Sequence, residues 1–457
     1  MPYKSESGRY ERARRLGHVP IIESEFVRSR LRTYRVLPHT DAGAIDATQL
    51  VAVAPGHSPR PTPRWAFSFD GSTQEVATNE RYPSTRLGYV QIAGVLVDLA
   101  NLLEERRHRF VDPASIRDAT SRSLMGMVLP GSNVCTADAQ TVRDSWRGEV
   151  FDLFKEYAIE GQTLLSMLIH LLRVGDRASD VGNPLLKKCS ADDACPAVEI
   201  EVPADGIACP ECGGRLYPTD VLRIHEEVQE LASNATALGR LMTTLEHLTM
   251  LCYVQFLLER QPRLLASVVF FMDGPLALFG PPAPIKRAVE AYLFYVAARL
   301  RSANLGLPAI VGIEKTGQFA EHAAEIEPNV APQTLVRLPD EYIFRHIIAT
   351  RARAASGFGS DTYYGRKFFY KSLTGQMLTI TVPCLDPQLF QTLSHDDPAS
   401  YETLPQTLAL LDEVGTRLYQ DALIPIALAH SYAAIPLQTG SKVLTLLSRE
   451  LLGRSQS

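Results

Sequence analysis

The chain has 457 residues, of which 46% are hydrophobic and 21% are charged, and its formal net charge is -5. This length exceeds what one hydrophobic core usually serves, so we expect two modules or one domain with a large insertion. The weakly acidic charge gives no general attraction for nucleic acid. A DNA-binding surface would therefore need a local concentration of Lys and Arg.

The start of the chain and its cysteines bear on cellular location. Residues 1–20 are polar and basic and lack the apolar centre of a secretory signal. No uninterrupted apolar run approaches the roughly 20 residues that a membrane-spanning helix needs. We therefore expect a cytoplasmic protein without membrane contact, in which the seven cysteines favour metal binding over a disulfide framework.

The first quarter of the chain contains one strand with an unusual ending. Residues 1–34 are predicted to be helical and charged, and the Pro-rich segment 52–64 to be a linker. The apolar strand WAFSFDGS (65–72) is predicted to end at Asp70 and Gly71. Residues 87–105 begin as a buried strand and continue as a helix.

The middle of the chain is irregular and rich in Pro, Gly and Cys. Residues 112–222 are predicted to be an insertion around a helix near 150–173. Regular structure is expected to resume with a helix that starts at Thr219 and Asp220 and ends near Arg260, because Pro262 follows.

A strand, a helix and a strand then follow in order. SVVFFMDG (267–274) is a short apolar strand that ends on Asp273, residues 284–304 form an amphipathic helix, and 308–317 is strand-like. This order predicts a parallel sheet covered by helices. Later residues predict a helical stretch from Asp340, a hairpin around Gly375, and helices at 401–418 and 437–452.

Four cysteines form a compact cluster in the predicted insertion. They are Cys189, Cys195, Cys209 and Cys212, and the second pair is a tight C-x-x-C knuckle followed by glycines. Such a knuckle brings two thiolates to one tetrahedral ion, so a structural zinc ribbon is favoured over four unrelated thiols. His225 is a substitute ligand, and the remaining cysteines are interpreted as small core residues.

Asp70 and Asp273 have the same place at the end of apolar strands. If the two strands are parallel neighbours, both carboxylates emerge at one edge of the sheet, where open α/β folds place their sites. Adjacent carboxylates repel each other, so their pairing indicates a divalent cation, and hard oxygen ligands favour magnesium or manganese. The alternative for each is an ordinary Asp-Gly turn.

Length selects the third acid. From Glu246 to Arg260 is about 21 Å at the helical rise, and from Ser267 to Asp273 is about 20 Å at the strand rise. Glu246 therefore falls level with Asp273 if the helix and the strand are antiparallel. The alternative is that Glu246 points to solvent or pairs with an Arg.

These motifs together resemble a known family. FSFDGS, LMTTLEHL, FFMDGPL, VGIEK and IALAHSYAAIP occur in the order and spacing of the NurA nucleases, DNA-end-processing enzymes that work beside the HerA-type hexameric translocase. The resemblance covers roughly residues 65–110 and 220–450. It implies an α/β fold with a ribonuclease H-like mixed sheet flanked by helices, manganese- or magnesium-dependent cleavage of DNA, and a homodimer docked on the ATPase.

Carried over by position, the resemblance assigns roles to individual residues. Asp70, Glu246 and Asp273 match the metal-binding acids, and His430 matches the late histidine, which would position water, protonate the leaving group or ligate a second metal. The alternative for His430 is a core histidine. Lys315 would hold a phosphate, or is an ordinary lysine after a strand.

One basic segment is a weaker candidate for contact with nucleic acid. Arg366, Lys367 and Lys371 alternate with aromatic residues in YYGRKFFYK, a mixture suited to single-stranded DNA. A hairpin with a basic outer face and an aromatic inner face explains the same pattern.

The predicted organisation follows from these assignments. It comprises an N-terminal helical and linker segment (1–64), the first part of a nuclease core (65–111), an insertion (112–222) with the zinc ribbon at about 186–217, and the second part of the core (223–457). The hypotheses are a metal-dependent DNA nuclease in DNA repair or anti-phage defence, a non-catalytic scaffold that recruits DNA or the ATPase, and a ribbon that reads DNA ends directly.

Overall fold

The computed structural model describes most of the chain. The described residues are 18–34, 45–53, 63–78, 84–105, 120–176, 178–348, 357–392, 395–416, 422–435 and 439–454. Most of the predicted linker 52–64 and the first half of the predicted N-terminal helical segment lie outside them. The described part of that segment forms two short helices, α1 (Val19–Glu23) and α2 (Glu25–Thr33).

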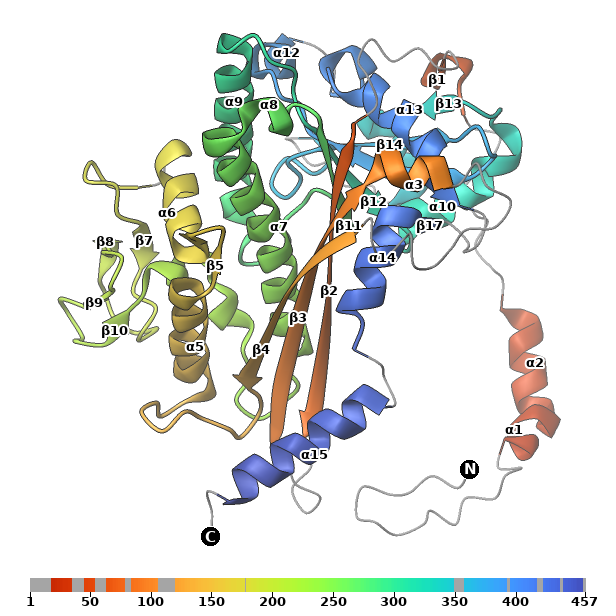
Figure 1. Ribbon diagram of the computed structural model, residues 1–457. Coiled ribbons are helices and arrows are strands. Elements are labelled where there is room, and N and C mark those ends of the chain that lie inside the picture. The colour runs from red at the N-terminus through yellow and green to blue at the C-terminus, as the bar shows by residue number, and fades with distance from the viewer. Residues whose placement is uncertain are drawn as a thin grey trace.

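A nine-stranded mixed sheet lies at the centre of the described residues (Figure 1). Its strand order is β1-β13-β14-β15-β12-β11-β2-β3-β4. The strands are β1 (Leu50–Ala52), β2 (Trp65–Ala77), β3 (Arg86–Asp98), β4 (Thr120–Pro130), β11 (Val268–Asp273), β12 (Ala309–Glu314), β13 (Thr334–Val336), β14 (Arg366–Lys371) and β15 (Met377–Val382).

The direction of the strands defines the fold class. Strands β2, β3 and β4 form an antiparallel meander, β11 is parallel to β2, and β12 is parallel to β11. The order β4-β3-β2-β11-β12 with these directions is that of a ribonuclease H-like core. Strands β15, β14, β13 and β1 extend it as antiparallel neighbours. The predicted fold class and the predicted parallel pair on either side of helix 284–304 are confirmed.

One face of the sheet carries the larger hydrophobic core. It is covered by α5 (Val142–Glu156), α6 (Leu164–Val174), α7 (Ala235–Arg260) and α9 (Lys286–Ser302). Helix α7 is long and apolar enough to span a membrane by length and composition, but 78% of its apolar window is buried inside the protein. It is therefore the central helix of this core, and in Figure 1 it runs along the long strands of the sheet.

The opposite face carries a second core. It is covered mainly by α3 (Leu99–Glu105), α13 (Leu404–Val414) and α14 (Ile424–Ala433). The other helices are α8 (Pro262–Leu265), α10 (Gln318–Ile326), α11 (Asp340–Tyr342), α12 (Pro387–Thr392) and α15 (Thr439–Arg454), with short 3-10 segments at Ala47–Gln49, Pro218–Leu222, Ile224–Glu227, Ala283–Ile285, Glu327–Asn329 and Pro398–Ser400 and a π-helical turn at Ile343–Ile347.

Two predicted boundaries are wrong. Strand β2 does not end at Asp70 but continues to Ala77, because every residue from Trp65 to Ala77 has a partner in β3. The long helix does not start at Thr219 and Asp220 but at Ala235. Asp220 instead binds Arg147 through two hydrogen bonds of 3.0 and 2.7 Å, and a left-handed residue at Arg223 interrupts the chain.

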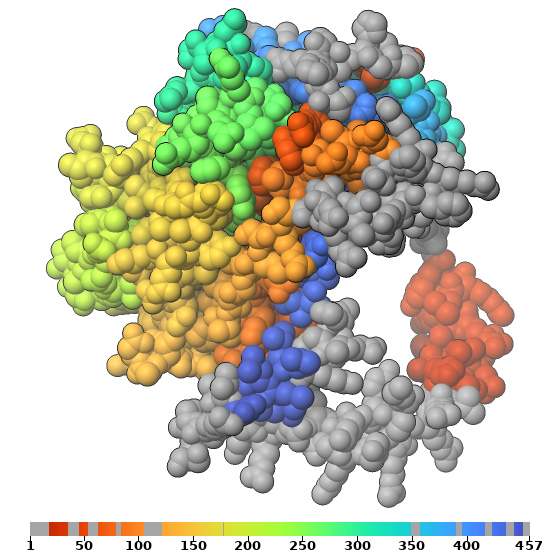
Figure 2. Space-filling model, in the orientation of Figure 1, coloured from red at the N-terminus to blue at the C-terminus, as the bar shows by residue number. Residues whose placement is uncertain are grey.

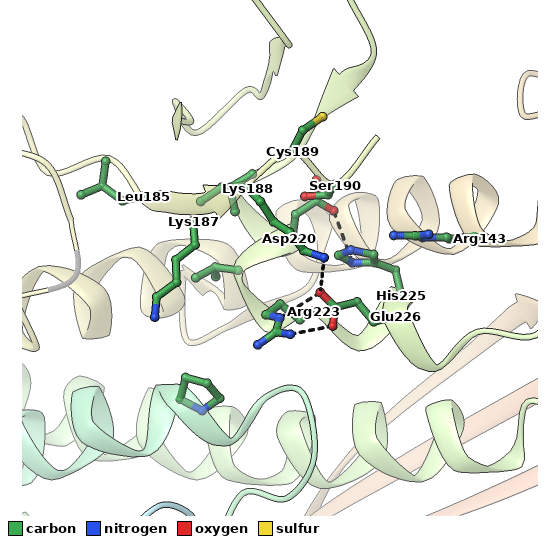
Figure 3. A pocket seen from close by; sticks show the side chains of 13 residues that line it. Arg143, Leu185, Lys187, Lys188, Cys189, Ser190, Asp220, Arg223, His225 and Glu226 are labelled. Carbon is green, nitrogen blue, oxygen red and sulfur yellow. Dashed lines mark hydrogen bonds and ion pairs between the residues drawn. The ribbon is translucent and has the colours of Figure 1, made fainter. Parts of the chain in front are cut away.

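The cysteine-containing segment forms a small module beside the core. It consists of two short hairpins, β7 (Leu185–Lys188) with β8 (Val198–Glu201) and β9 (Ile207–Ala208) with β10 (Arg215–Leu216). In Figure 2 the yellow and green surface of this module and of α5 and α6 forms one side of the molecule. A pocket lies where the module meets the core (Figure 3).

The range predicted to be an insertion, 112–222, also contains an element of the main sheet. Strand β4 falls within it and pairs with β3 over eleven residues. Two further two-stranded pairs lie outside the main sheet: β5 (Ala158–Ile159) with β6 (Gln162–Thr163), and β16 (Gly415–Thr416) with β17 (Ala422–Leu423).

The chain that follows β11 crosses directly over β12. A Cβ atom on Gly312 would lie 2.5 Å from the Gly274 carbonyl oxygen and 2.9 Å from the Leu276 nitrogen, and both are backbone atoms. The Gly274 amide also donates a hydrogen bond of 2.8 Å to the Ile313 carbonyl. Close approach at Gly312 therefore fixes the position of the residues next to Asp273.

We predict that Gly312→Ala lowers the free energy of unfolding by about 1–3 kcal/mol, because the added methyl group has to displace backbone. Denaturant unfolding followed by circular dichroism measures this. The control is Gly239→Ala in α7, where a Cβ atom meets nothing within 4 Å and where we expect a gain of about 0.5–1 kcal/mol. Equal stability of Gly312→Ala and the wild type would contradict the crossing.

Candidate metal and catalytic site

Asp70 and Asp273 lie side by side on neighbouring parallel strands. Phe69 is paired with Met272 in the β2–β11 register, which places Asp70 beside Asp273, the last residue of β11. Asp273 lies two residues after Phe271 and Asp70 four residues after Ala66, and both Phe271 and Ala66 belong to the second core, so each acid points to the same face as that residue. Their carboxylates are therefore on the sheet face that α14 covers.

Helix α14 brings a histidine to this pair. Ligand atoms of Asp70, Asp273 and His430 all lie within 4.8 Å of one another. The Nδ1 atom of His430 is 2.7 Å from Oδ2 of Asp70, and the side chain of His430 is 64% exposed while that of Asp70 is 9% exposed. The imidazole thus covers a buried carboxylate and remains accessible from outside.

Lys315 adds a positively charged side chain to the group. It follows the last residue of β12, and its Nζ atom donates a hydrogen bond of 2.8 Å to Oδ2 of Asp273. The structure therefore places both Lys315 and His430 at the acids, each on a different aspartate.

Glu246 approaches from the other face of the sheet. It lies on α7, is only 4% exposed, and its Oε1 atom would be 2.8 Å from a Cβ atom on Gly71. The absence of a side chain at Gly71 lets the carboxylate lie against β2 next to Asp70. Among the residues that the structure describes, Glu246 is not within the group whose ligand atoms lie within 4.8 Å of one another.

The charges of these acids oppose one another. Burial, and then the neighbouring Asp273, raise the pKa of Asp70, and the hydrogen bond and charge of His430 partly offset this rise. Burial, and then Asp70 and Asp273, hold the pKa of Glu246 well above its usual range, although the Gly71 amide acts in the opposite direction. A positive charge between the acids would relieve both effects.

The donor set fits a divalent cation. Carboxylate oxygens are the ligands that suit magnesium and manganese, and two adjacent carboxylates withdrawn from water are costly without a cation. The residues that would hold it are Asp70, Asp273 and Glu246, with His430 as a further ligand or as an acid–base group.

Two buried residues that the sequence patterns did not indicate support this arrangement. His247, next to Glu246, has its Nε2 atom 3.1 Å from the Ala277 carbonyl oxygen and its Nδ1 atom 2.6 Å from the Tyr364 hydroxyl. Burial lowers the pKa of His247 to about 4. A neutral ring that donates from Nε2 and accepts at Nδ1 satisfies both contacts. Helix α7 is thus tied to the chain after Asp273.

The basic segment on β14 does not form an exposed surface. Arg366, Lys367 and Lys371 are 8%, 0% and 8% exposed. Arg366 pairs with Asp340 at 2.8 Å, Lys367 with Glu314, and Lys371 with Glu327. Adjacent residues of a strand point to opposite faces, so Arg366 and Lys367 lie on different faces of β14. Basic and aromatic residues therefore do not separate onto two faces. We therefore do not retain these residues as a contact with DNA.

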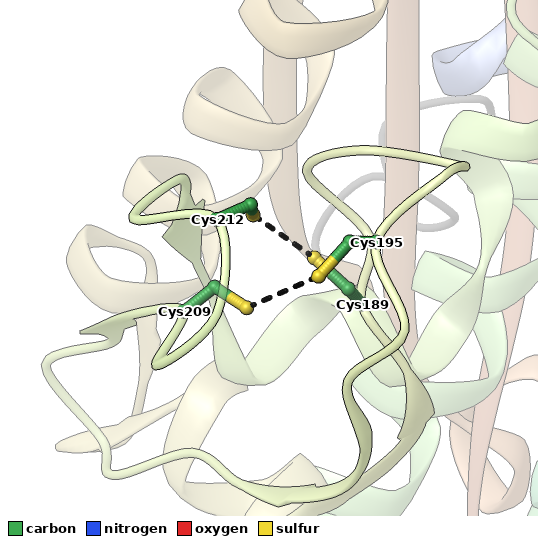
Figure 4. Close-up of side chains that lie close together, drawn as sticks. All are labelled: Cys189, Cys195, Cys209 and Cys212. Carbon is green, nitrogen blue, oxygen red and sulfur yellow. Dashed lines mark hydrogen bonds between the residues drawn. The ribbon is translucent and has the colours of Figure 1, made fainter.

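The four cysteines of the module converge (Figure 4). All four sulfur atoms lie within 4.8 Å of one another. The Sγ atoms of Cys189 and Cys212 are 3.7 Å apart, as are those of Cys195 and Cys209. A tetrahedral zinc ion with Zn–S bonds of about 2.3 Å requires sulfur atoms about 3.8 Å apart. The cluster therefore fits zinc with four thiolate ligands and no open position.

The knuckle supports its thiolates in the expected way. The pKa of Cys209 is lowered to about 7, mainly by a hydrogen bond from the backbone amide of Cys212 and also by one from that of Glu211. His225 is buried, and its Nδ1 atom lies 3.8 Å from Asp220. It is outside the four-cysteine group, as are Cys135, Cys252 and Cys384.

The chain was compared with known protein families, curated proteins and solved structures. No model of a known protein family matches the sequence, and no curated protein matches it. The structure is similar to the crystal structure of the NurA nuclease from Sulfolobus solfataricus, with a TM-score of 0.35 and 9% identity over 97% of this chain and 98% of that chain.

The raised pKa of Glu246 predicts how the stability of the metal-free protein depends on pH. The folded protein holds the Glu246 proton more tightly than the unfolded chain, so the free energy of unfolding falls as the pH rises above the ordinary Glu value of 4.5. Glu246→Gln removes this penalty. We expect the variant to be more stable than the wild type at pH 8 by on the order of 1 kcal/mol and to depend less on pH.

Denaturant unfolding at pH 5 and pH 8 without divalent ions tests this prediction. Glu259→Gln, at the exposed end of the same helix, is the matched control and should leave the pH dependence unchanged. A stability loss at pH 8 in Glu246→Gln would show that the carboxylate is ionised and satisfied in the metal-free protein.

The cysteine module gives a separate prediction. Purified protein is expected to contain one zinc ion per chain, and Cys209→Ser to lose it and to unfold at lower temperature, because a structural zinc contributes its binding energy to folding. Elemental analysis and thermal unfolding measure both effects. Cys135→Ser, at an exposed cysteine outside the cluster, should change neither. Wild-type stability in a zinc-free Cys209→Ser protein would argue against the site.

Proposed function

We propose that the protein is a divalent-metal-dependent DNA nuclease that hydrolyses phosphodiester bonds. The observation that carries this proposal is the convergence of Asp70, Asp273 and His430 within 4.8 Å, with Glu246 on the other side of β2. The resemblance of the sequence motifs to those of the NurA nucleases supports DNA as the substrate. The proposed role is DNA-end processing in repair or anti-phage defence, as a homodimer beside a HerA-type hexameric ATPase.

Magnesium or manganese would be held by Asp70, Asp273 and Glu246. When bound, such a cation activates water and stabilises the negative charge on the leaving 3'-oxygen. The three acids would determine its place, since two of them are fixed by strand pairing and the third lies on a helix that the His247 contacts anchor.

Two further residues act on the substrate in this proposal. His430 is exposed on one side and bound to Asp70 on the other, so its ring can position water or protonate the leaving group while Asp70 orients it. Lys315 donates to Asp273 in the structure, and its Nζ atom could instead donate to a phosphate oxygen of the substrate.

A non-catalytic scaffold for DNA or the ATPase is the alternative. The acids argue against it, because a protein that only binds DNA has no reason to keep like charges buried together at a cost in stability.

Replacing either aspartate by asparagine tests the proposal. We expect Asp70→Asn and Asp273→Asn to lower manganese-dependent cleavage of labelled linear DNA by on the order of 10²–10³-fold or more, since each removes a charged ligand of the cation. Thermal unfolding should show that both variants stay folded. Asp152→Asn, at an exposed acid of α5, should cleave as the wild type does. Full activity in Asp70→Asn or Asp273→Asn would refute the site.

A further inference from the structure

A pocket separate from the acidic site lies between the cysteine module and the core (Figure 3). It has a volume of about 210 Å³. Strand β7 and the start of the first cysteine loop form one wall, and the 3-10 segments around Asp220 and Glu226 form another. Pro284, in the 3-10 segment before α9, and Arg143 of α5 complete it. The pocket is thus built from the module and the core together.

The pocket has more positive than negative charge. Asp220 is paired with Arg147, Arg143 with Asp193 at 2.7 Å, and Arg223 with Glu226 at 2.7 Å. Two cations are left in excess. Lys188 is 3.9 Å from Glu226, which Arg223 already holds, and no acid lies within ion-pair distance of Lys187 among the described residues. In Figure 3 Lys188 turns towards Glu226 while Lys187 extends to one side.

The remaining lining combines apolar surface with a neutral buried histidine. Leu185, Val221 and Pro284 contribute aliphatic walls. His225 is 7% exposed, and burial lowers its pKa to about 4, so its ring is uncharged at neutral pH and can serve as a hydrogen-bond partner. An excess of two positive charges beside aliphatic walls complements a small ligand with an anionic end and a flat, weakly polar end.

We propose that this pocket binds one nucleotide, with the phosphate at Lys187 and Lys188 and the base against Leu185, Val221 and Pro284. The choice of a nucleotide rests on the proposed nuclease function, since DNA is the polymer that such a protein handles. The volume lies below the range of about 300–1,000 Å³ that is usual for drug-sized ligands, which suits a single unit rather than a longer segment. An acidic peptide, which would spread over the surface, fits a pocket of this size less well.

The cysteine cluster would hold the pocket in shape. Lys187 and Lys188 directly precede Cys189, which both lines the pocket and belongs to the four-cysteine group. A metal bound by the four sulfurs fixes the end of β7, and with it the backbone of the two lysines. The module would then give the nuclease a second contact with the DNA strand, built from residues other than the catalytic acids.

Fluorescence anisotropy of the zinc-loaded full chain tests the proposal. The probe is a short, 3'-labelled oligothymidylate with a 5'-phosphate, in buffer without added magnesium or manganese, so that the test does not depend on cleavage. We expect Lys187→Glu to weaken binding by about tenfold and to reduce the slope of log affinity against log salt by about 0.7, the value for one lost contact with a single strand. Arg263→Glu, the same charge change at an exposed residue of α8, is the control and should have little effect.

A second variant and two competitors make the outcome specific. Leu185→Trp keeps every charge but fills the pocket, and it should weaken binding as Lys187→Glu does. Thymidine 5'-monophosphate should displace the probe at much lower concentration than inorganic phosphate does. Equal displacement by the two would overturn a nucleotide site. Displacement of the probe by an acidic peptide alone would overturn it in favour of a protein partner.

The same measurements show whether the pocket takes a DNA end or an internal nucleotide, and whether binding there is separate from cleavage. A larger loss of affinity for the 5'-phosphorylated probe than for the unphosphorylated one would place a DNA end in the pocket, and equal losses would place an internal nucleotide there. Unchanged binding and salt dependence in both Lys187→Glu and Leu185→Trp would refute the pocket, even if manganese-dependent cleavage is present. A chain that binds nucleotide here but cleaves no DNA would refute only the nuclease.

Discussion

Asp70 and Asp273 repel each other at a place where the sheet leaves them no freedom to separate. Parallel pairing of β2 with β11 fixes their spacing, and burial removes the water that would screen their charges. Much of the surrounding structure counters this repulsion. His430 binds one acid and Lys315 the other, so the metal-free protein places one basic group on each aspartate. A divalent cation between the acids would relieve the same repulsion, as the proposed function requires.

The two faces of the sheet contribute differently to this site. Helix α14 supplies a histidine that is open to the outside, whereas α7 supplies a glutamate that is fully enclosed. Glycine at position 71 makes the second contribution possible, since a side chain there would occupy the place of the Glu246 carboxylate. The His247 contacts to Tyr364 and to the Ala277 carbonyl then join α7 to the chain that leaves Asp273. Acids on separate elements are thereby held in one geometry.

The sequence predicted the parts of this arrangement that depend on short-range pattern. The strand ending at Asp273, the strand around Asp70 and the parallel pairing follow from apolar runs and their order, whereas the ribonuclease H-like class was implied by the resemblance of the motifs to the NurA nucleases. Simple lengths placed Glu246 level with Asp273, and the structure puts it on the far side of β2, against Gly71. The close C-x-x-C spacing indicated a zinc ligand set, and the four sulfurs do converge.

Long-range pairing accounts for what the sequence did not predict. Nothing near Lys367 in the sequence shows that Glu314 is its partner, so a buried ion pair had the pattern of an exposed basic segment. The polar residues after Asp70 gave no sign that β2 continues, because β3 supplies its hydrogen bonds. Asp220 has the pattern of a helix start, but it is taken by Arg147, 73 residues away. In each case the deciding partner is distant in the chain.

The most direct measurement is anomalous diffraction at the manganese absorption edge from crystals soaked in manganese. We expect a peak bounded by oxygen atoms of Asp70 and Asp273, with Glu246 facing it and Lys315 no longer bonded to Asp273. A manganese-containing crystal with no peak between these acids, and with Lys315 still on Asp273, would contradict the assignment of this cluster as the metal site.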